Sequence, residues 1–174
     1  MIRSATCAAA LFTLAMPALA GPEAFQPGTV VPDYGKVAMI EGSELSADTV
    51  MKVAFDIGQA GPEDAISRSL ETPARFLNMH AAAGVDPANL HVALIVHGAA
   101  SADLLTDEAR GAPNPNTGLI AELLAAGATI ELCGQTSAMR DIAPEDLLPG
   151  VTIGLSAMST HALLQQQGYT LNPF

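Results

Sequence analysis

One cysteine offers the clearest chemistry in this sequence. Cys133 ends an apolar run, residues 129–133, and is followed directly by Gly134. A short apolar run that stops at a glycine predicts a buried strand. In α/β proteins, ligands and reactive groups usually lie at the carboxyl ends of parallel strands. A thiol in that place can act as a nucleophile once it ionises to the thiolate.

Two other polar residues lie at the ends of predicted strands. Asp56 is close to the end of the run 51–57, and His97 is the last residue of the run 90–97. If these strands are neighbours, Asp56, His97 and Cys133 converge on one rim of the sheet. A histidine near a thiol favours the thiolate, so His97 is a candidate group for tuning Cys133.

Two charged residues near Cys133 in the sequence act on the thiol in opposite directions. Glu131 shares a strand face with Cys133, and a nearby carboxylate disfavours the thiolate. Arg140 is the cation best placed in the sequence to offset it. The sequence therefore indicates Cys133, His97 and Arg140 as candidate site residues.

A structural interpretation of the same residues stands beside the chemical one. A cysteine on an apolar strand also packs well as a small buried hydrophobe, and His97 can simply hydrogen-bond at a strand end. Asp56 can cap a turn, and His91 and His161 are given no role. Cysteine and histidine recur at no metal-ligand spacing such as C-x-x-C or H-E-x-x-H, so no metal is predicted.

Predicted strands and helices alternate from residue 50 onward. The strands are expected at 51–57, 90–97, 129–133 and 151–155. The helices are expected at 62–83 (two helices, or one kinked at Pro73), 102–105, 117–126, 143–148 and 160–167, with a loop at 134–140. This alternation predicts a three-layer α/β fold with a mainly parallel sheet of four to five strands and helices on both faces. Neither G-x-G-x-x-G nor a P-loop is present, so no cofactor is predicted.

The first twenty residues have the pattern of a secretory signal. Arg3 precedes a short apolar run at 5–15, and residues 18–20 fit a small-x-small cleavage site before Gly21. The run is shorter than the ~20 apolar residues needed to span a bilayer. We therefore expect a periplasmic protein with an extended arm at 21–49 and an α/β domain at 50–174.

Processing changes the cysteine count and the charge. Cys7 would leave with the signal, so Cys133 would be the only thiol of the mature chain. The full chain has 7 basic and 18 acidic residues, and loss of Arg3 leaves 6 against 18, a net charge of −12. A surface this acidic repels phosphate backbones and anionic membranes, which argues against a nucleic-acid partner.

Several short motifs, in order, resemble those of the DsrE/DsrF-like family. They are Asn-Pro-Asn at 114–116, Leu-Leu-Ala-Ala-Gly-Ala at 123–128, Cys-Gly-Gln at 133–135, Leu-Leu-Pro-Gly-Val at 147–151 and Leu-Gln-Gln-Gln-Gly-Tyr at 164–169. The His-Gly pair at 97–98 fits as well, and Tyr-Gly-Lys-Val at 34–37 resembles the arm of the exported branch. The resemblance implies a compact, mainly parallel α/β fold, often assembled into homo-oligomers.

The resemblance also implies a function for the cysteine. In the sulfur-relay members a cysteine carries sulfur as a persulfide, and Cys133 matches that position. Some relatives have a second cysteine three residues later, where this chain has Thr136, so a vicinal dithiol mechanism is not expected.

The leading hypothesis is a periplasmic DsrE-like protein that binds or relays sulfur through Cys133, as a carrier and not as a turnover enzyme. Its expected partners are a sulfur donor or acceptor protein or a small sulfur compound, with other copies of the chain in a homo-oligomer. The alternative is a non-catalytic oligomeric binding or scaffold module with a buried structural Cys133. Binding of a small ligand at the strand-end rim is compatible with both.

Overall fold

The computed structural model describes residues 21–172, and the predicted signal segment lies outside them. Its centre is a five-stranded sheet with the order β4-β3-β2-β1-β5, in which all neighbouring strands are parallel. The strands are β1 (Met51–Ile57), β2 (Leu90–Val96), β3 (Thr129–Cys133), β4 (Thr152–Gly154) and β5 (Thr170–Asn172). The prediction of a mainly parallel sheet of four to five strands is confirmed.

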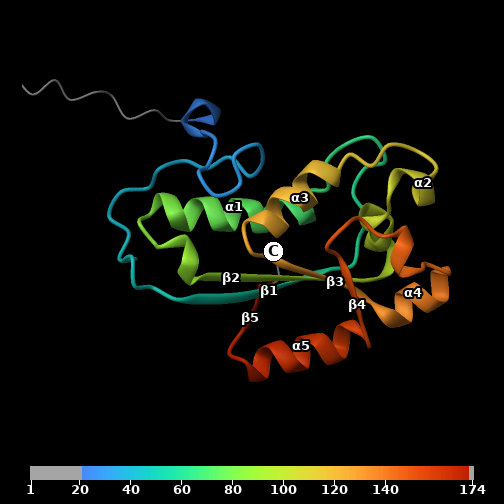
Figure 1. Ribbon diagram of the computed structural model, residues 1–174. Coiled ribbons are helices and arrows are strands. Elements are labelled where there is room, and N and C mark those ends of the chain that lie inside the picture. The colour runs from blue at the N-terminus through green and yellow to red at the C-terminus, as the bar shows by residue number, and fades with distance from the viewer. Residues whose placement is uncertain (1–20, 173–174) are drawn as a thin grey trace, which may run out of the picture.

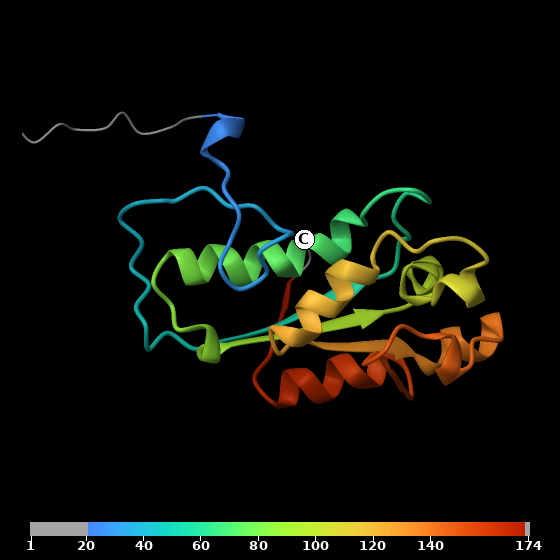
Figure 2. The same cartoon turned by 45° about the horizontal axis from the view of Figure 1, so that its top comes forward.

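Helices cover both faces of the sheet, as Figure 1 and the turned view in Figure 2 show. On one face lie α1 (Arg68–Ala82) and α3 (Thr117–Ala125), and on the other lies α5 (Ala157–Gln166). The shorter α2 (Asp107–Arg110) and α4 (Gly134–Arg140) gather beyond the carboxyl ends of the strands. The described residues also form the 3-10 helices η1 (Pro22–Ala24), η2 (Pro87–Asn89), η3 (Gly98–Leu104) and η4 (Pro144–Asp146).

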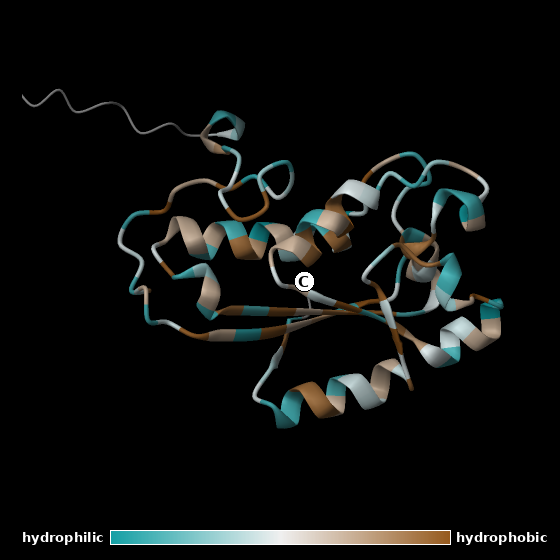
Figure 3. Cartoon of the chain, viewed as in Figure 1, coloured by the Kyte–Doolittle hydropathy of each residue, from teal (hydrophilic) through white to brown (hydrophobic). Residues whose placement is uncertain are grey.

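The two faces of the sheet are packed unequally. Alternate residues of β1 (Val53, Phe55 and Ile57) join the large core beneath α1 and α3. The α5 face has a much smaller buried cluster of Ala54, Ala93 and Ile95. The central strand β2 buries six of its seven residues, as expected for a strand covered on both sides, whereas the edge strands β4 and β5 are less uniformly apolar in Figure 3. The thinner apolar layer beneath α5 leaves space for polar side chains at the end of the sheet.

Several predicted elements differ from the structure. The helices expected at 102–105 and 143–148 are the 3-10 helices η3 and η4. The first long helix begins at Arg68, not Pro62, and it passes through Pro73 without ending. The segment after Cys133 is the helix α4, not a loop. The last helix begins at Ala157, not Thr160, because the Ser156 side chain accepts the backbone N–H of Ser159 and caps the helix earlier.

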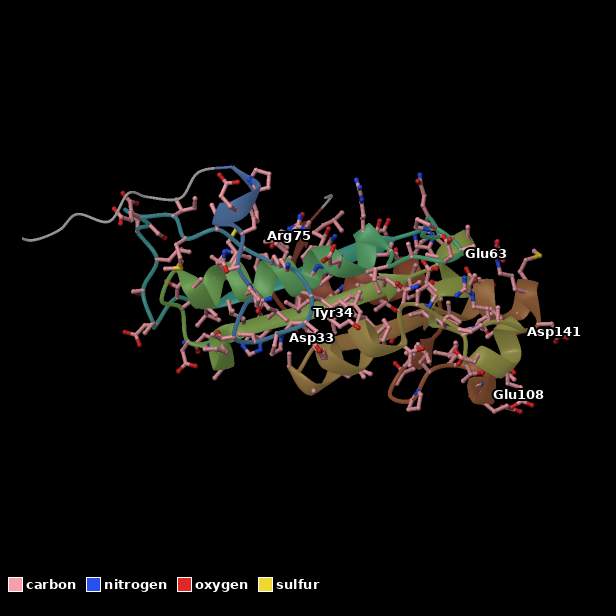
Figure 4. The ribbon with its side chains drawn as sticks, turned by 90° about the horizontal axis from the view of Figure 1, so that it is seen from above. Asp33, Tyr34, Glu63, Arg75, Glu108 and Asp141 are labelled. Carbon is pink, nitrogen blue, oxygen red and sulfur yellow. The ribbon has the colours of Figure 1, made fainter. Side chains whose placement is uncertain are left out.

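The N-terminal arm is extended and lies over α1 and α3. Asn78 of α1 holds it: Oδ1 accepts the N–H groups of Val30 and Val31, and Nδ2 donates to the carbonyls of Val31, Tyr34 and Gly35. Val31 is fully buried, and a single antiparallel bridge joins Gln26 to Val37. From above, Asp33 and Tyr34 lie against the two helices (Figure 4). The arm is thus part of the packed structure of residues 21–172.

None of the helices within residues 21–172 has the length and apolarity that a membrane crossing requires.

Candidate functional site

Cys133 lies at the junction of β3 and α4. Ile130 and Leu132 of β3 point into the large core, so the alternation of strand side chains turns Glu131 and Cys133 toward the α5 face. Cys133 is both the last residue of β3 and the N-cap residue of α4. The thiol is therefore held by the strand on one side and by the first turn of a helix on the other.

Gly134 makes this sharp junction sterically feasible. A Cβ at this position would lie 2.3 Å from the carbonyl oxygen of Gly154 and 3.0 Å from that of Leu155. Any side chain would push the start of α4 away from the end of β4. The glycine after Cys133 is therefore explained by close backbone packing.

Hydrogen-bond donors surround the Cys133 sulfur and lower its pKa. Burial of the thiol acts in the opposite direction and raises the pKa, but the donors outweigh it. The donors are the backbone N–H groups of Ala157, Thr136 and Gln135 and the Thr136 hydroxyl. They come from the first turns of α4 and α5, whose unpaired N–H groups favour a negative charge. The thiolate is thus stabilised by polar groups of the fold, with no cation among them.

Two histidines hold the carboxylate of Asp56 on the same face of the sheet as the thiol, two strands away. The Nε2 atom of His161 lies 2.8 Å from Oδ1 of Asp56, and the Nε2 atom of His97 lies 3.2 Å from the same oxygen. Burial raises the pKa of the Asp56 carboxyl, but the hydrogen bonds from His161 and His97 outweigh this and lower it overall. Asp56 is therefore ionised at neutral pH and accepts from both rings.

These groups line one pocket of about 350 Å³ that is open to solvent, at the carboxyl ends of β1, β2 and β3 and the start of α5. Its lining residues are Asp56, His97, Cys133, Gln135, Thr136, Ser156, Ala157, Met158 and His161. Cys133 itself is only 7% exposed. The thiol is therefore shielded from bulk solvent, and a small reagent would reach it through this pocket.

The structure brings together three of the residues that the sequence placed on one rim: Asp56, His97 and Cys133. Arg140 is not with them, because it is the last residue of α4 and is exposed, whereas Cys133 precedes the first. Glu131 is also outside the pocket lining, and its carboxylate accepts a hydrogen bond from the Thr160 hydroxyl. The lowered pKa of Cys133 thus comes from hydrogen-bond donors, without Arg140.

Sequence reasoning missed His161 and the part played by Thr136. His161 belongs to α5, which crosses the sheet from β4 at one edge to β5 at the other and so passes beneath β1. This crossing depends on β5, a strand whose residues the sequence pattern does not identify. In the sequence, Thr136 stood out only because some relatives have a second cysteine at its position. In the structure, its hydroxyl oxygen accepts the Gly98 N–H at 3.0 Å, and its hydroxyl donates to Cys133.

Within residues 21–172, no group of three or more histidine, cysteine, aspartate or glutamate side chains is arranged to hold a metal ion.

Sequence comparison places the chain in a family. The profile of the DsrE/DsrF-like family matches residues 52–173, which is most of the sequence. The chain belongs to the DsrE/DsrF-like family. A comparison with proteins of curated function gives no significant match.

One solved structure supports the fold, and a second aligns less well. A protein of unknown function from Methanobacterium thermoautotrophicum, MTH1491, aligns with a TM-score of 0.56 and 21% identity over 71% of this chain and 99% of its own. The ychN protein from E. coli aligns with a TM-score of 0.46 and 20% identity over 71% of this chain and 100% of its own. At 21% identity the likeness to MTH1491 concerns the fold alone.

Proposed function

We propose that this DsrE/DsrF-like protein carries sulfur as a persulfide on Cys133. Membership of the family suggests a role of the sulfur-relay type. The observation that carries the proposal is the thiol itself, which lies in an open pocket among hydrogen-bond donors that lower its pKa. The thiolate is the nucleophilic form, so such surroundings favour attack on a sulfane sulfur.

One thiol is sufficient for this reaction. The Cys133 thiolate attacks the outer sulfur of a donor persulfide, a new S–S bond forms, and the old S–S bond breaks with its electron pair on the donor thiolate. Sulfur moves without net oxidation, and a later acceptor thiolate removes it in the same way. Thr136 stands where a second cysteine would allow a disulfide, and here it serves as a hydrogen-bond donor to the sulfur.

The proposal extends to location and assembly. Residues 1–20 have the pattern of a secretory signal, which supports export to the periplasm. Large apolar side chains are exposed at the pocket and on neighbouring elements: Met158 (80%) lines the pocket, Met139 (85%) belongs to α4 and Leu155 (75%) follows β4. Exposed apolar groups of this kind are typical of protein–protein contacts, which supports a homo-oligomer or docking of a donor or acceptor protein.

Mass spectrometry tests the proposed carrier. The chain from Gly21 onward, incubated with inorganic polysulfide, should gain the mass of one sulfur atom, and a thiol reductant should remove it. Cys133→Ser should gain nothing, since this variant keeps the size of the side chain but has no thiol. Absence of the adduct in the unmodified chain would reject the carrier function.

The second candidate is a non-catalytic binding or scaffold module in which Cys133 is structural. The low exposure of Cys133 favours it. Labelling with iodoacetamide separates the two, because the carrier reacts in the native state through the pocket, whereas a structural cysteine reacts only after denaturation.

A further inference from the structure

The two histidines bound to Asp56 are not equivalent. Both Nε2 atoms meet the same carboxylate oxygen, at 3.2 Å for His97 and 2.8 Å for His161. An ionised carboxylate can only accept hydrogen bonds, so each Nε2 carries the hydrogen. Each ring then has one remaining nitrogen, Nδ1, and the surroundings of these two atoms differ.

His161 uses its ring to hold Asp56. Its side chain is 16% exposed, and its buried Nδ1 atom has no hydrogen-bond partner among residues 21–172. A hydrogen on this Nδ1 would remain unmatched in the interior, which is costly. His161 is thus left with one polar contact, its donation to Asp56 from α5.

His97 has its second nitrogen free for chemistry. Its side chain is 35% exposed and lines the pocket with Cys133, and its Nδ1 makes no hydrogen bond to any of residues 21–172. Val96 pairs with Leu132 in the parallel ladder, so His97 and Cys133 are the next residues on strands that lie ~4.8 Å apart. His97 and Cys133 therefore lie side by side at the ends of neighbouring strands and line the same pocket.

We propose that His97 transfers the proton during sulfur transfer to Cys133, and that Asp56 and His161 are positioning residues that fix its ring. The substrate class is a small persulfide, R–S–SH, which suits a pocket of about 350 Å³. This inference rests on the proposed carrier function and goes further by assigning the proton.

The proposed step balances in atoms and electrons. The Cys133 thiol gives its proton to Nδ1 of His97, and Sγ attacks the outer sulfur of R–S–SH. The bond from that sulfur to R–S breaks, and its electron pair leaves on R–S⁻. The proton then passes from Nδ1 to R–S⁻, giving Cys133–S–SH and R–SH with no external oxidant or reductant. General acid–base help of this kind is typically worth 10²–10⁴-fold.

The test compares two reactions of Cys133 that differ in the leaving group. Glutathione persulfide releases a thiolate that takes up a proton, whereas iodoacetamide releases iodide, which does not. His97→Gln keeps an N–H for Asp56 but has no second nitrogen. It should slow sulfur transfer about 100-fold. Alkylation at about pH 9.5, where the thiol is ionised, should stay at the wild-type rate.

The positioning residues are tested by rescue. His161→Ala should slow sulfur transfer, and His161→Gln should restore part of the rate because its amide N–H can again donate to Asp56. His91→Gln, at the opposite end of β2, is the matched control and should change neither reaction. Thermal unfolding of each variant confirms that the fold is retained.

Two results would overturn the proton-transfer role of His97 while leaving the carrier function intact. In the first, His97→Gln accepts sulfur as fast as the wild-type chain. In the second, sulfur transfer and alkylation slow by the same factor in His97→Gln. If the wild-type chain takes up no sulfur from either persulfide or polysulfide, the carrier function fails and the role of His97 fails with it.

Discussion

At the scale of single residues, the Thr136 hydroxyl is a specific determinant of thiol reactivity. It accepts the Gly98 N–H and donates to Cys133, so Thr136→Val removes a donor while keeping the shape of the side chain. A hydrogen bond to a charged group contributes ~1.5–3 kcal/mol, so the pKa of Cys133 should rise in Thr136→Val.

The pH dependence of alkylation by iodoacetamide measures this change. The wild-type thiol should show a lower apparent pKa than the thiol of Thr136→Val. Thr136→Ser retains a hydroxyl and should behave as the wild-type chain does. Equal midpoints in the valine and serine variants would show that the hydroxyl does not act on the thiol.

Asp56 links the stability of the fold to acidity. Its pKa in the folded state is lowered, chiefly by the hydrogen bonds from His161 and His97 against the opposing effect of burial. The ionised carboxylate therefore stabilises the fold above the unfolded-state pKa of about 4, and this contribution is lost as the pH falls through the lower folded-state value.

Chemical denaturation at about pH 5 and about pH 3 measures this contribution. Between these two pH values, the free energy of unfolding should decrease more in the wild-type chain than in Asp56→Asn. Asp48→Asn, at an exposed position of the arm, controls for the loss of one negative charge. A parallel decline in all three chains would contradict the linkage.

At the scale of elements, the junction between β3 and α4 depends on Gly134. Alanine normally stabilises a helix relative to glycine by roughly 0.5–1 kcal/mol, but here its Cβ would meet the Gly154 carbonyl at 2.3 Å. We expect Gly134→Ala to destabilise the fold by about 1–3 kcal/mol in urea unfolding and to slow alkylation of Cys133. Ala138→Gly, on the exposed side of α4, should cost no more than about 1 kcal/mol and leave alkylation unchanged. A stabilising Gly134→Ala would mean that α4 can move away from β4 without cost.

At the scale of the whole molecule, Asn78 attaches the arm to the domain. Its side-chain amide forms hydrogen bonds with both N–H groups and carbonyls of the arm around the buried Val31. Asn78→Ala should lower the free energy of unfolding by roughly 2–4 kcal/mol, because it leaves several buried backbone groups without partners. It should also open residues 21–49 to limited proteolysis. Asn89→Ala, which removes one exposed bond to Ala47, should do neither. Equal cleavage of the two variants would show that the arm is held by other contacts.

The amino-acid sequence by itself determined the class of fold and the place of the thiol. Apolar runs that end in glycine, separated by amphipathic segments, specify buried parallel strands with helices between them. Because such strands present their carboxyl ends at one edge, Asp56, His97 and Cys133 could be placed on one rim from their positions in the sequence alone.

Only the tertiary structure decided what surrounds that thiol. The donors to Cys133 are mostly backbone N–H groups at the starts of α4 and α5, which side-chain patterns do not reveal. Arg140 was chosen for its charge and nearness in sequence, but the turns of α4 separate it from the sulfur. His161 reaches Asp56 from 105 residues away because α5 crosses the sheet from β4 to β5. The path of the chain through space sets these contacts, and local sequence does not encode it.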